Sequence, residues 1–241
     1  HYRLFAGDKL KMINIIFGSD EQNDSQQQGA KHGLPGAISV SDAHLLAFPM
    51  RSNIAPFVMV TCPAVLQRLN NNLEFTGKNP ITIPELADND KAVVLYGQLE
   101  QNTTVLLEDV LVTTQGDTDF KFPDGFPQPD NLLLISNATF DYCVSSCTEI
   151  QTQIKIDSEK GTTKDGSLRY QELLPADTIL YSVVYFTCQY APEMDNGGAG
   201  ELNSFQAQMI KEHVQEVING FIQIGGDETL GRGICKLNWI D

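Results

Sequence analysis

The sequence predicts an α+β fold built on a ferredoxin-like βαββαβ core. Segments with helical and with strand-type periodicity follow one another in the order α-β-β-α-β-β-β-α-β. Mixed helices and mostly antiparallel strands are typical of α+β folds, and this order suits the ferredoxin-like arrangement. With 241 residues, 41% of them hydrophobic, the chain can bury one sizeable core, so we expect a single domain over residues 1–241.

Three longer segments carry the helical pattern. Residues 2–17 place apolar side chains at helical spacing until a glycine interrupts them. Residues 130–147 begin at Asp130, a residue type that caps helices. Residues 203–219 form the clearest helix, which Gly220 stops. Its apolar stripe consists of Phe205, Met209, Ile210, Val214, Val217 and Ile218.

The strand-type segments lie between these helices. In residues 149–157 apolar and polar side chains alternate, which predicts a half-exposed antiparallel strand. Residues 178–188 form the longest apolar run, which is too short to cross a bilayer and predicts a buried strand. The other expected strands are 37–50, 57–62, 92–96, 105–113, 168–174, 221–224 and 234–240, and a short helix follows Pro63 over residues 64–69.

Polar stretches rich in glycine and proline separate these elements. They cover residues 19–36, 70–90, 116–129 and 191–200. Residues 70–90 contain two prolines and are typical of an insertion. The chain begins without Met and without a cationic, apolar leader, inside a helical pattern. We therefore expect that an N-terminal segment, truncated or disordered, precedes His1.

The net charge of −15 argues against nucleic acid as a partner. Proteins that neutralise phosphates usually carry a basic excess. The net charge does not decide the question, because binding depends on a local patch and acidic faces suit basic partner subunits.

The five cysteines are odd in number and lie mostly in apolar surroundings. This usage is typical of reduced, buried thiols in a cytoplasmic protein. Cys143 and Cys147 are four residues apart and would share one helical face, a spacing that also suits a metal ion. No second Cys or His pair lies nearby in the sequence to complete four ligands, so core packing is favoured and no metal site is expected.

The segment from Ile222 to Ile234 is the most informative candidate binding site. Its glycines let the backbone approach a ligand closely and turn N–H groups outward, and Arg232 is placed for a phosphate contact. The alternative is a tight connection with a surface arginine. The segment is neither a Walker loop nor a dinucleotide fingerprint, because it lacks the Lys-Ser/Thr ending and precedes a strand. The candidate residues are Gly225, Gly226, Thr229, Gly231, Arg232 and Gly233.

A second candidate lies at the end of the strand over residues 37–50. Arg51 and Ser52 follow Pro49, which ends the strand ladder there. An arginine held beside a hydroxyl suits a backbone phosphate. A surface or ion-paired arginine is the equally weighted alternative.

These segments together carry a family resemblance. Read with residues 37–43, 60–66 and 173–182, the chain resembles the backbone subunit of the type III-B CRISPR effector, the Cmr complex, which belongs to the Cas seven-type RAMP proteins. The resemblance implies a cytoplasmic antiviral ribonucleoprotein in which copies of the subunit stack along a guide RNA beside other Cmr subunits. It also implies a thumb-like hairpin that kinks the guide, for which residues 70–90 are the candidate.

The resemblance further implies that bound target RNA is cleaved with the help of a divalent metal, of which Mg²⁺ is the favoured one. It also implies that an Asp on a loop after the first strand of the fold takes part in this cleavage. That strand is expected N-terminal to this sequence, so no catalytic residue is assigned here and no cofactor is evident in this chain. Asp42, Asp227 and Glu228 have structural explanations, the last two as residues that orient the glycine-rich loop.

Two other functions remain open from the sequence. A guide-processing endoribonuclease of the same RAMP superfamily would need a general acid–base pair, for which His44 is the one modest candidate. An acidic scaffold that binds protein alone would account for the net charge. The context of Arg51 and Arg232 favours the RNA-binding subunit.

Overall fold

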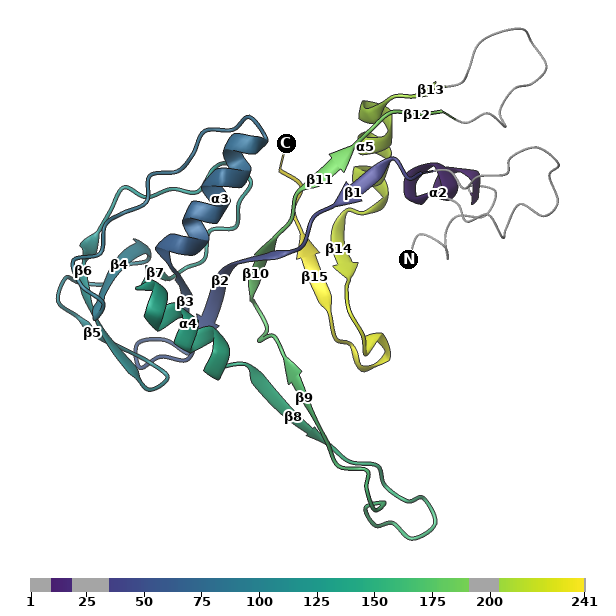
Figure 1. Ribbon diagram of the computed structural model, residues 1–241. Helices are drawn as coiled ribbons and strands as arrows, with labels where there is room; N and C mark the ends of the chain where they lie inside the picture. Colours follow the sequence, from purple (N-terminus) through teal and green to yellow (C-terminus); the bar gives the residue numbers. More distant parts are fainter. Residues whose placement is uncertain (1–9, 19–34, 191–203, 241) are drawn as a thin grey trace, which may run out of the picture. The chain divides into compact units, whose positions relative to one another are not determined.

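The computed structural model describes residues 10–18, 35–190 and 204–240 (Figure 1). The chain divides into two compact units, and the single domain over 1–241 remains a prediction. Unit 1 comprises residues 1–42 and 182–241, and unit 2 comprises residues 43–181. In the described part of the chain no helix is long and apolar enough to span a membrane. The fold is mixed α+β, as predicted.

Unit 2 is built around a seven-stranded mixed sheet in the order β10-β2-β3-β7-β4-β6-β5. The pairs β3–β7 and β4–β6 are parallel, and the other neighbours are antiparallel. The strands are β2 (His44–Met50), β3 (Val58–Thr61), β4 (Lys91–Tyr96), β5 (Thr104–Leu107), β6 (Val110–Asp117), β7 (Leu132–Leu134) and β10 (Ile179–Tyr181).

Two helices cover opposite faces of this sheet. On β3, Val58 and Val60 pack with α4 (Asn137–Ser146), while Met59 between them packs with α3 (Pro63–Phe75). Alternate residues of a strand point to opposite faces, so the two clusters lie on the two sides of the sheet. The sheet is therefore buried on both faces, which explains why its central strands are continuous apolar runs.

The helix predicted over residues 130–147 begins later than expected. Leu132 to Leu134 are fully buried as strand β7, and the helix starts only at Asn137. Ser136 is the N-cap, since its side chain accepts a hydrogen bond from the Thr139 backbone N–H at 3.1 Å. The predicted cap, Asp130, precedes the strand instead, because three leucines between two sheet neighbours gain more from burial than from helical hydrogen bonds.

Residues 70–90, the candidate thumb, contain no strand. Residues 70–75 complete α3, and the side chains of Ile81, Ile83 and Leu86 pack on the α3 side of the sheet. Asn70 is buried and fixes this segment with both ends of its amide, donating to the Ile81 carbonyl at 2.9 Å and accepting from the Ile81 N–H at 2.8 Å.

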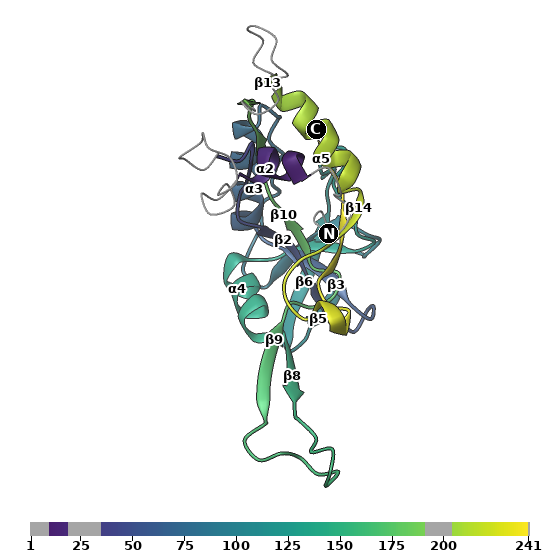
Figure 2. The same ribbon diagram turned by 90° about the vertical axis from the view of Figure 1, so that its right-hand side faces the viewer.

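The projecting hairpin of unit 2 is formed by β8 (Glu149–Gln153) and β9 (Arg169–Leu173), drawn in green in Figures 1 and 2. The predicted antiparallel strand is present, but it is more exposed than expected. Ile150 is 72% exposed and Tyr170 69% exposed, although they lie on the apolar face of the hairpin. This hairpin is a two-stranded sheet without a covering layer within the described residues.

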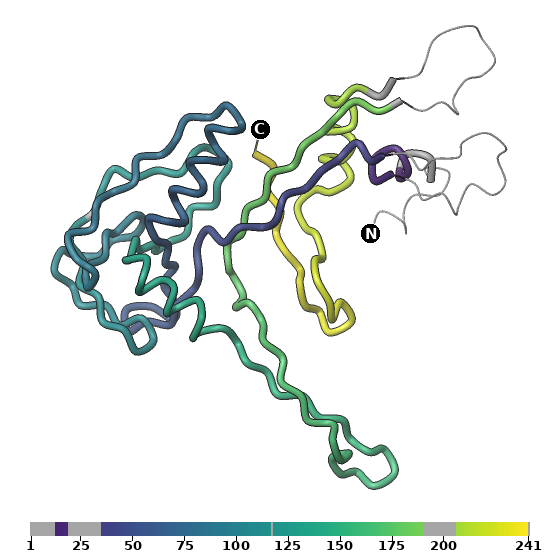
Figure 3. Tube along the Cα trace, in the orientation of Figure 1, coloured from purple at the N-terminus to yellow at the C-terminus, as the bar shows by residue number. Residues whose placement is uncertain are grey.

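Unit 1 contains α2 (Leu10–Phe17), α5 (Ala207–Val217), one turn of 3-10 helix, η4 (Glu228–Leu230), and three pairs of antiparallel strands. Ile16 of α2 packs with Ile210 and Val214 of α5. The strands are β1 (Ile38–Val40) with β11 (Val184–Phe186), β12 (Gln189–Tyr190) with β13 (Ser204–Phe205), and β14 (Gly220–Gln223) with β15 (Ile234–Leu237). The trace of β14 and β15 is the yellow hairpin of Figure 3.

The long strands predicted over 37–50 and 178–188 are each divided in two. In the gap between β1 and β2 and in the gap between β10 and β11, serine hydroxyls take the place of some backbone partners. The Ser41 hydroxyl accepts from the Val183 N–H at 2.9 Å, and the Ser182 hydroxyl donates to the Ser41 carbonyl at 2.9 Å. Serine hydroxyls compete with backbone pairing, which accounts for the interruption.

Candidate functional site

Arg51 lies where β2 ends, beside the turn that joins β5 and β6. Its side chain is 84% exposed, and its Nε is 3.2 Å from a carboxylate oxygen of Glu108. The Arg51 carbonyl also accepts a hydrogen bond from the Glu108 N–H at 3.0 Å. The guanidinium is thus oriented by Glu108 through Nε, while its two terminal nitrogens have no recorded partner in the described residues.

Ser52 is held by the same turn. It forms an isolated antiparallel bridge with Leu107, and Asn53 accepts a hydrogen bond from the Leu106 N–H at 2.9 Å. The Ser52 hydroxyl is 3.4 Å from the Ile54 N–H, which is a weak contact. Contacts with the β5–β6 turn thus fix the backbone at both residues, and a phosphate contact by Arg51 and Ser52 remains a prediction.

The surroundings of Arg51 are acidic. Next to Glu108 lies Asp109, whose carboxylate accepts a hydrogen bond from the Tyr142 hydroxyl at 2.8 Å. A phosphate at Arg51 would therefore meet nearby negative charge.

Burial raises the pKa of the Cys143 thiol to about 12, and the charges of neighbouring groups, including Asp109, contribute to this rise. Cys143 is fully buried, which confirms core packing for this thiol.

The glycine-rich segment forms the connection between β14 and β15. Gly225, Gly231 and Gly233 have positive φ angles, and Asp227 adopts the left-handed conformation. A Cβ atom on Gly233 would lie 1.9 Å from the Ile224 carbonyl oxygen, and the Ile224 N–H donates to the Gly233 carbonyl at 2.8 Å. Gly233 is therefore required by the tightness of the turn itself.

Arg232 is ion-paired inside this loop. Its Nη1 is 2.7 Å from the Asp227 carboxylate, and the exposed fraction of its side chain is 20%. The Asp227 carbonyl accepts from the Leu230 N–H at 2.8 Å, so Asp227 also stabilises η4. Asp227 is a loop-orienting residue, as the sequence indicated. Gly226 and Thr229 are exposed in the same loop.

The predicted residues fall into two groups. Arg51 and Ser52 belong to unit 2, and the glycine-rich segment belongs to unit 1, so each group is described within its own unit. Among the described residues, no three His, Cys, Asp or Glu side chains gather closely enough to hold a metal ion.

Sequence reasoning missed a cluster around Tyr181. The Tyr181 hydroxyl accepts a hydrogen bond from Asn72 Nδ2 at 3.1 Å, and the ring centroids of His44 and Tyr181 are 5.5 Å apart. Arg68 lies one helical turn before Asn72 on α3. The spacing of four between these two residues was visible in the sequence, but their proximity to β10 depends on the packing of the sheet.

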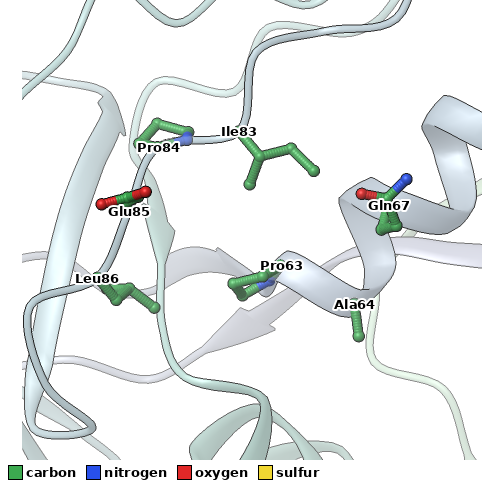
Figure 4. Close-up of a pocket in the computed structure, with 7 residues that line it drawn as sticks. All are labelled: Pro63, Ala64, Gln67, Ile83, Pro84, Glu85 and Leu86. Atoms are coloured by element: carbon green, nitrogen blue, oxygen red, sulfur yellow. The ribbon is translucent and has the colours of Figure 1, made fainter.

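The described residues also line a shallow, open depression beside the start of α3 (Figure 4). Its walls come from α3 and from the segment that Asn70 holds in place, and it contains none of the predicted site residues. The lining residues are Pro63, Ala64, Gln67, Ile83, Pro84, Glu85 and Leu86.

Comparison with known proteins gives consistent matches over nearly the whole chain. The chain is 32% identical over 240 residues to the CRISPR system Cmr endoribonuclease Cmr4 of Pyrococcus furiosus, covering 93% of this chain and 74% of that protein. The crystal structure of oligomeric Cmr4 from P. furiosus matches with a TM-score of 0.62 and 25% identity, covering 98% of this chain and 79% of that one.

A cryo-EM structure of the type III-B Cmr-beta complex in its apo state has a chain of the same fold. Its TM-score is 0.69 at 20% identity, covering 99% of this chain and 79% of that chain. The model of the RAMP superfamily matches residues 2–236. Because that match spans almost every residue of both units, the chain belongs to the RAMP superfamily.

Proposed function

We propose that this chain is an RNA-binding backbone subunit of a type III-B CRISPR (Cmr) effector complex, stacking in several copies along a guide RNA. The observation that carries the proposal is the 32% identity to Cmr4 over 93% of the chain. Likeness to oligomeric Cmr4 supports contacts between copies. The shared fold with a Cmr-beta complex bound to cognate target RNA is consistent with target RNA and other Cmr subunits as partners.

The ferredoxin-like core belongs to unit 1 in this proposal. Among its elements, α2, β1, β11, α5 and β14 follow one another in the order αββαβ, which is part of the βαββαβ pattern. The antiparallel pair β1–β11 and the packing of both helices through Ile16, Ile210 and Val214 support it.

The thumb is the β8–β9 hairpin rather than residues 70–90. Supporting this are its projection from the sheet and its exposed apolar face. Its tip offers Lys155, Lys160 and Lys164 to phosphates, interspersed with Asp157, Glu159 and Asp165. Cationic and aromatic side chains on one hairpin suit RNA, since phosphates attract the former and bases stack on the latter.

The contacts to guide phosphates include Arg51 and Ser52 in unit 2. In unit 1 they include Gly225, Gly226, Thr229, Gly231, Arg232 and Gly233. The terminal nitrogens of Arg51 suit bidentate binding of a phosphate, with Glu108 setting the orientation. Arg232 already uses one nitrogen for Asp227, so it offers fewer donors.

Cleavage of target RNA is also part of this proposal, in keeping with the endoribonuclease name of the relative. The role of a divalent metal such as Mg²⁺ is part of this proposal. Because no three metal-ligating side chains gather among the described residues, no catalytic step is assigned to them.

Salt dependence of RNA binding tests the assignment of Arg51. Labelled single-stranded RNA is titrated with the full chain at several salt concentrations, and each phosphate contact contributes about 0.7 to the slope of log K against log salt. Arg51→Ala should reduce the slope by about that amount. Lys121→Ala removes a charge from an exposed residue of the same unit and should leave the slope unchanged. Equal slopes for all three proteins would remove Arg51 from the RNA.

A further inference from the structure

We infer that unit 2 carries a second phosphate-binding site for single-stranded RNA, formed by Arg68, Tyr181 and His44. The inference rests on the proposed RNA-binding function and adds a site that the sequence did not suggest. It begins with a contrast between the arginines. Arg51 and Arg232 are both paired with carboxylates, whereas Arg68 has no recorded carboxylate partner in the described part of the chain.

Tyr181 is the fixed centre of the site. Its ring packs against the buried cluster between α3 and the sheet, and its hydroxyl accepts the hydrogen bond from Asn72 at 3.1 Å. A phenol hydroxyl that accepts in this way still has its own hydrogen to donate. No acceptor for that hydrogen is recorded among the described residues, so it is available to an incoming oxygen.

Arg68 supplies the positive charge. It is exposed, and residues four apart on a helix lie on the same face, so Arg68 neighbours the Asn72 side chain that holds Tyr181. Burial raises the pKa of the Tyr181 phenol, while the Asn72 hydrogen bond and the charge of Arg68 lower it. Arg68 thus brings one positive charge to the cluster, on a chain with a net charge of −15.

His44, on the neighbouring strand β2, is the third residue of the group. It pairs with Tyr181 in the register of β2 and β10, and the two rings are tilted by 54°. Its imidazole provides an N–H donor beside the phenol. A guanidinium, a phenol and an imidazole suit an anion, and the two half-buried rings also offer apolar surface to a ribose or base. A phosphodiester of RNA has both properties.

The test compares two substitutions that remove different donors. Arg68→Gln removes the charge and keeps most of the side-chain stem, and Tyr181→Phe removes only the hydroxyl. Gln67→Ala, exposed and adjacent on α3, is the matched control for helix packing, and Lys121→Ala is the control for net charge. Binding of the full chain to labelled single-stranded RNA, and to the same RNA paired with its complement, is measured across salt concentrations, and circular dichroism checks folding.

Arg68→Gln should weaken binding to single-stranded RNA roughly tenfold and reduce the salt slope by about 0.7. Tyr181→Phe should weaken it about fivefold without changing the slope. Unchanged binding by both variants, or a loss with paired RNA alone, would overturn the site while leaving the proposed function intact. If the unmodified chain binds no RNA, both the site and the proposed function fail. Should either variant unfold, Arg68→Lys, which keeps the charge, must retain binding for the site to stand.

Discussion

The Asp227 carboxylate holds the Arg232 guanidinium at 2.7 Å within the glycine-rich loop between β14 and β15. The pair is partly exposed, with 20% of the Arg232 side chain and 34% of the Asp227 side chain accessible. The same Asp227 residue accepts backbone hydrogen bonds through its carbonyl. The arginine that the sequence suggested for phosphate is therefore pre-oriented by a carboxylate that also opposes the binding of an anion.

This relationship predicts opposite effects of two substitutions on RNA binding. Arg232→Ala should weaken binding and reduce the salt slope by about 0.7. Asp227→Asn keeps the size of the side chain and removes its charge, so it should strengthen binding. Titration with labelled RNA at several salt concentrations measures both. Weaker binding by Asp227→Asn in a folded loop would show that orientation by the carboxylate matters more than its charge.

Gly233 should tolerate no side chain. Gly233→Ala would place a Cβ atom 1.9 Å from the Ile224 oxygen at a φ of 69°. We expect a loss of about 3 kcal/mol in the free energy of unfolding, because the clash adds to the cost of the left-handed conformation. Gly226→Ala is the matched control, since nothing lies within 4 Å of its added Cβ atom. Chemical denaturation compares the two, and equal losses would contradict the account of this turn.

The exposed face of the β8–β9 hairpin should matter for assembly and not for folding. Ile150→Thr and Tyr170→Thr should change the free energy of unfolding by no more than about 0.5 kcal/mol, because both side chains are exposed in the subunit. Both should reduce the stacking of copies on RNA, which sedimentation measures. For comparison, Leu133→Ala at a fully buried position should cost about 2–5 kcal/mol. Normal assembly of both hairpin variants would remove the thumb role from this hairpin.

Cys143 should be chemically inert until high pH. Burial raises the pKa of its thiol from 9.0 to about 12, so the reactive thiolate is scarce at neutral pH. Because the thiol keeps its proton longer in the folded state, its contribution to stability is complete below pH 9 and is lost between pH 9 and about 12. Alkylation followed by mass spectrometry should label the exposed Cys188 first. Equal rates at pH 8 would show that Cys143 is accessible.

The sequence predicted the types of the helices and strands better than the residues at which they begin and end. The helix over 203–219 is present as α5 over Ala207–Val217, and Ile210, Val214 and Ile218 of its predicted stripe pack in the core, while Met209 and Val217 are exposed and Phe205 lies in β13. The helix over 130–147 was too long because Leu132 to Leu134 have no periodicity that separates a buried strand from a helix. Polarity and two prolines predicted an insertion over residues 70–90, and only the fold reveals that Asn70 ties this segment to the core.

The sequence predicted individual candidate site residues, but it did not predict the side chains that form ion pairs with them. An arginine next to glycine or serine, a context that suits phosphate binding, can be recognised in the sequence. The turns of the fold bring Glu108 to Arg51 and Asp227 to Arg232, and these contacts cannot be read from the sequence. The cluster of His44, Arg68 and Tyr181 joins positions more than 100 residues apart in the sequence, as the 109-residue separation of Asn72 and Tyr181 illustrates. Such proximity follows from the strand order and not from a local pattern.

The most direct test of the central claim is the purification of the full chain with and without nuclease treatment. An RNA-binding subunit that stacks along a guide should elute without nuclease as particles that absorb ultraviolet light as nucleic acid does, contain RNA of defined length and show repeated subunits in electron micrographs. After nuclease treatment it should sediment as small species, because a net charge of −15 opposes contact between free copies. Particles without RNA, or long assemblies that survive complete removal of RNA, would contradict the account.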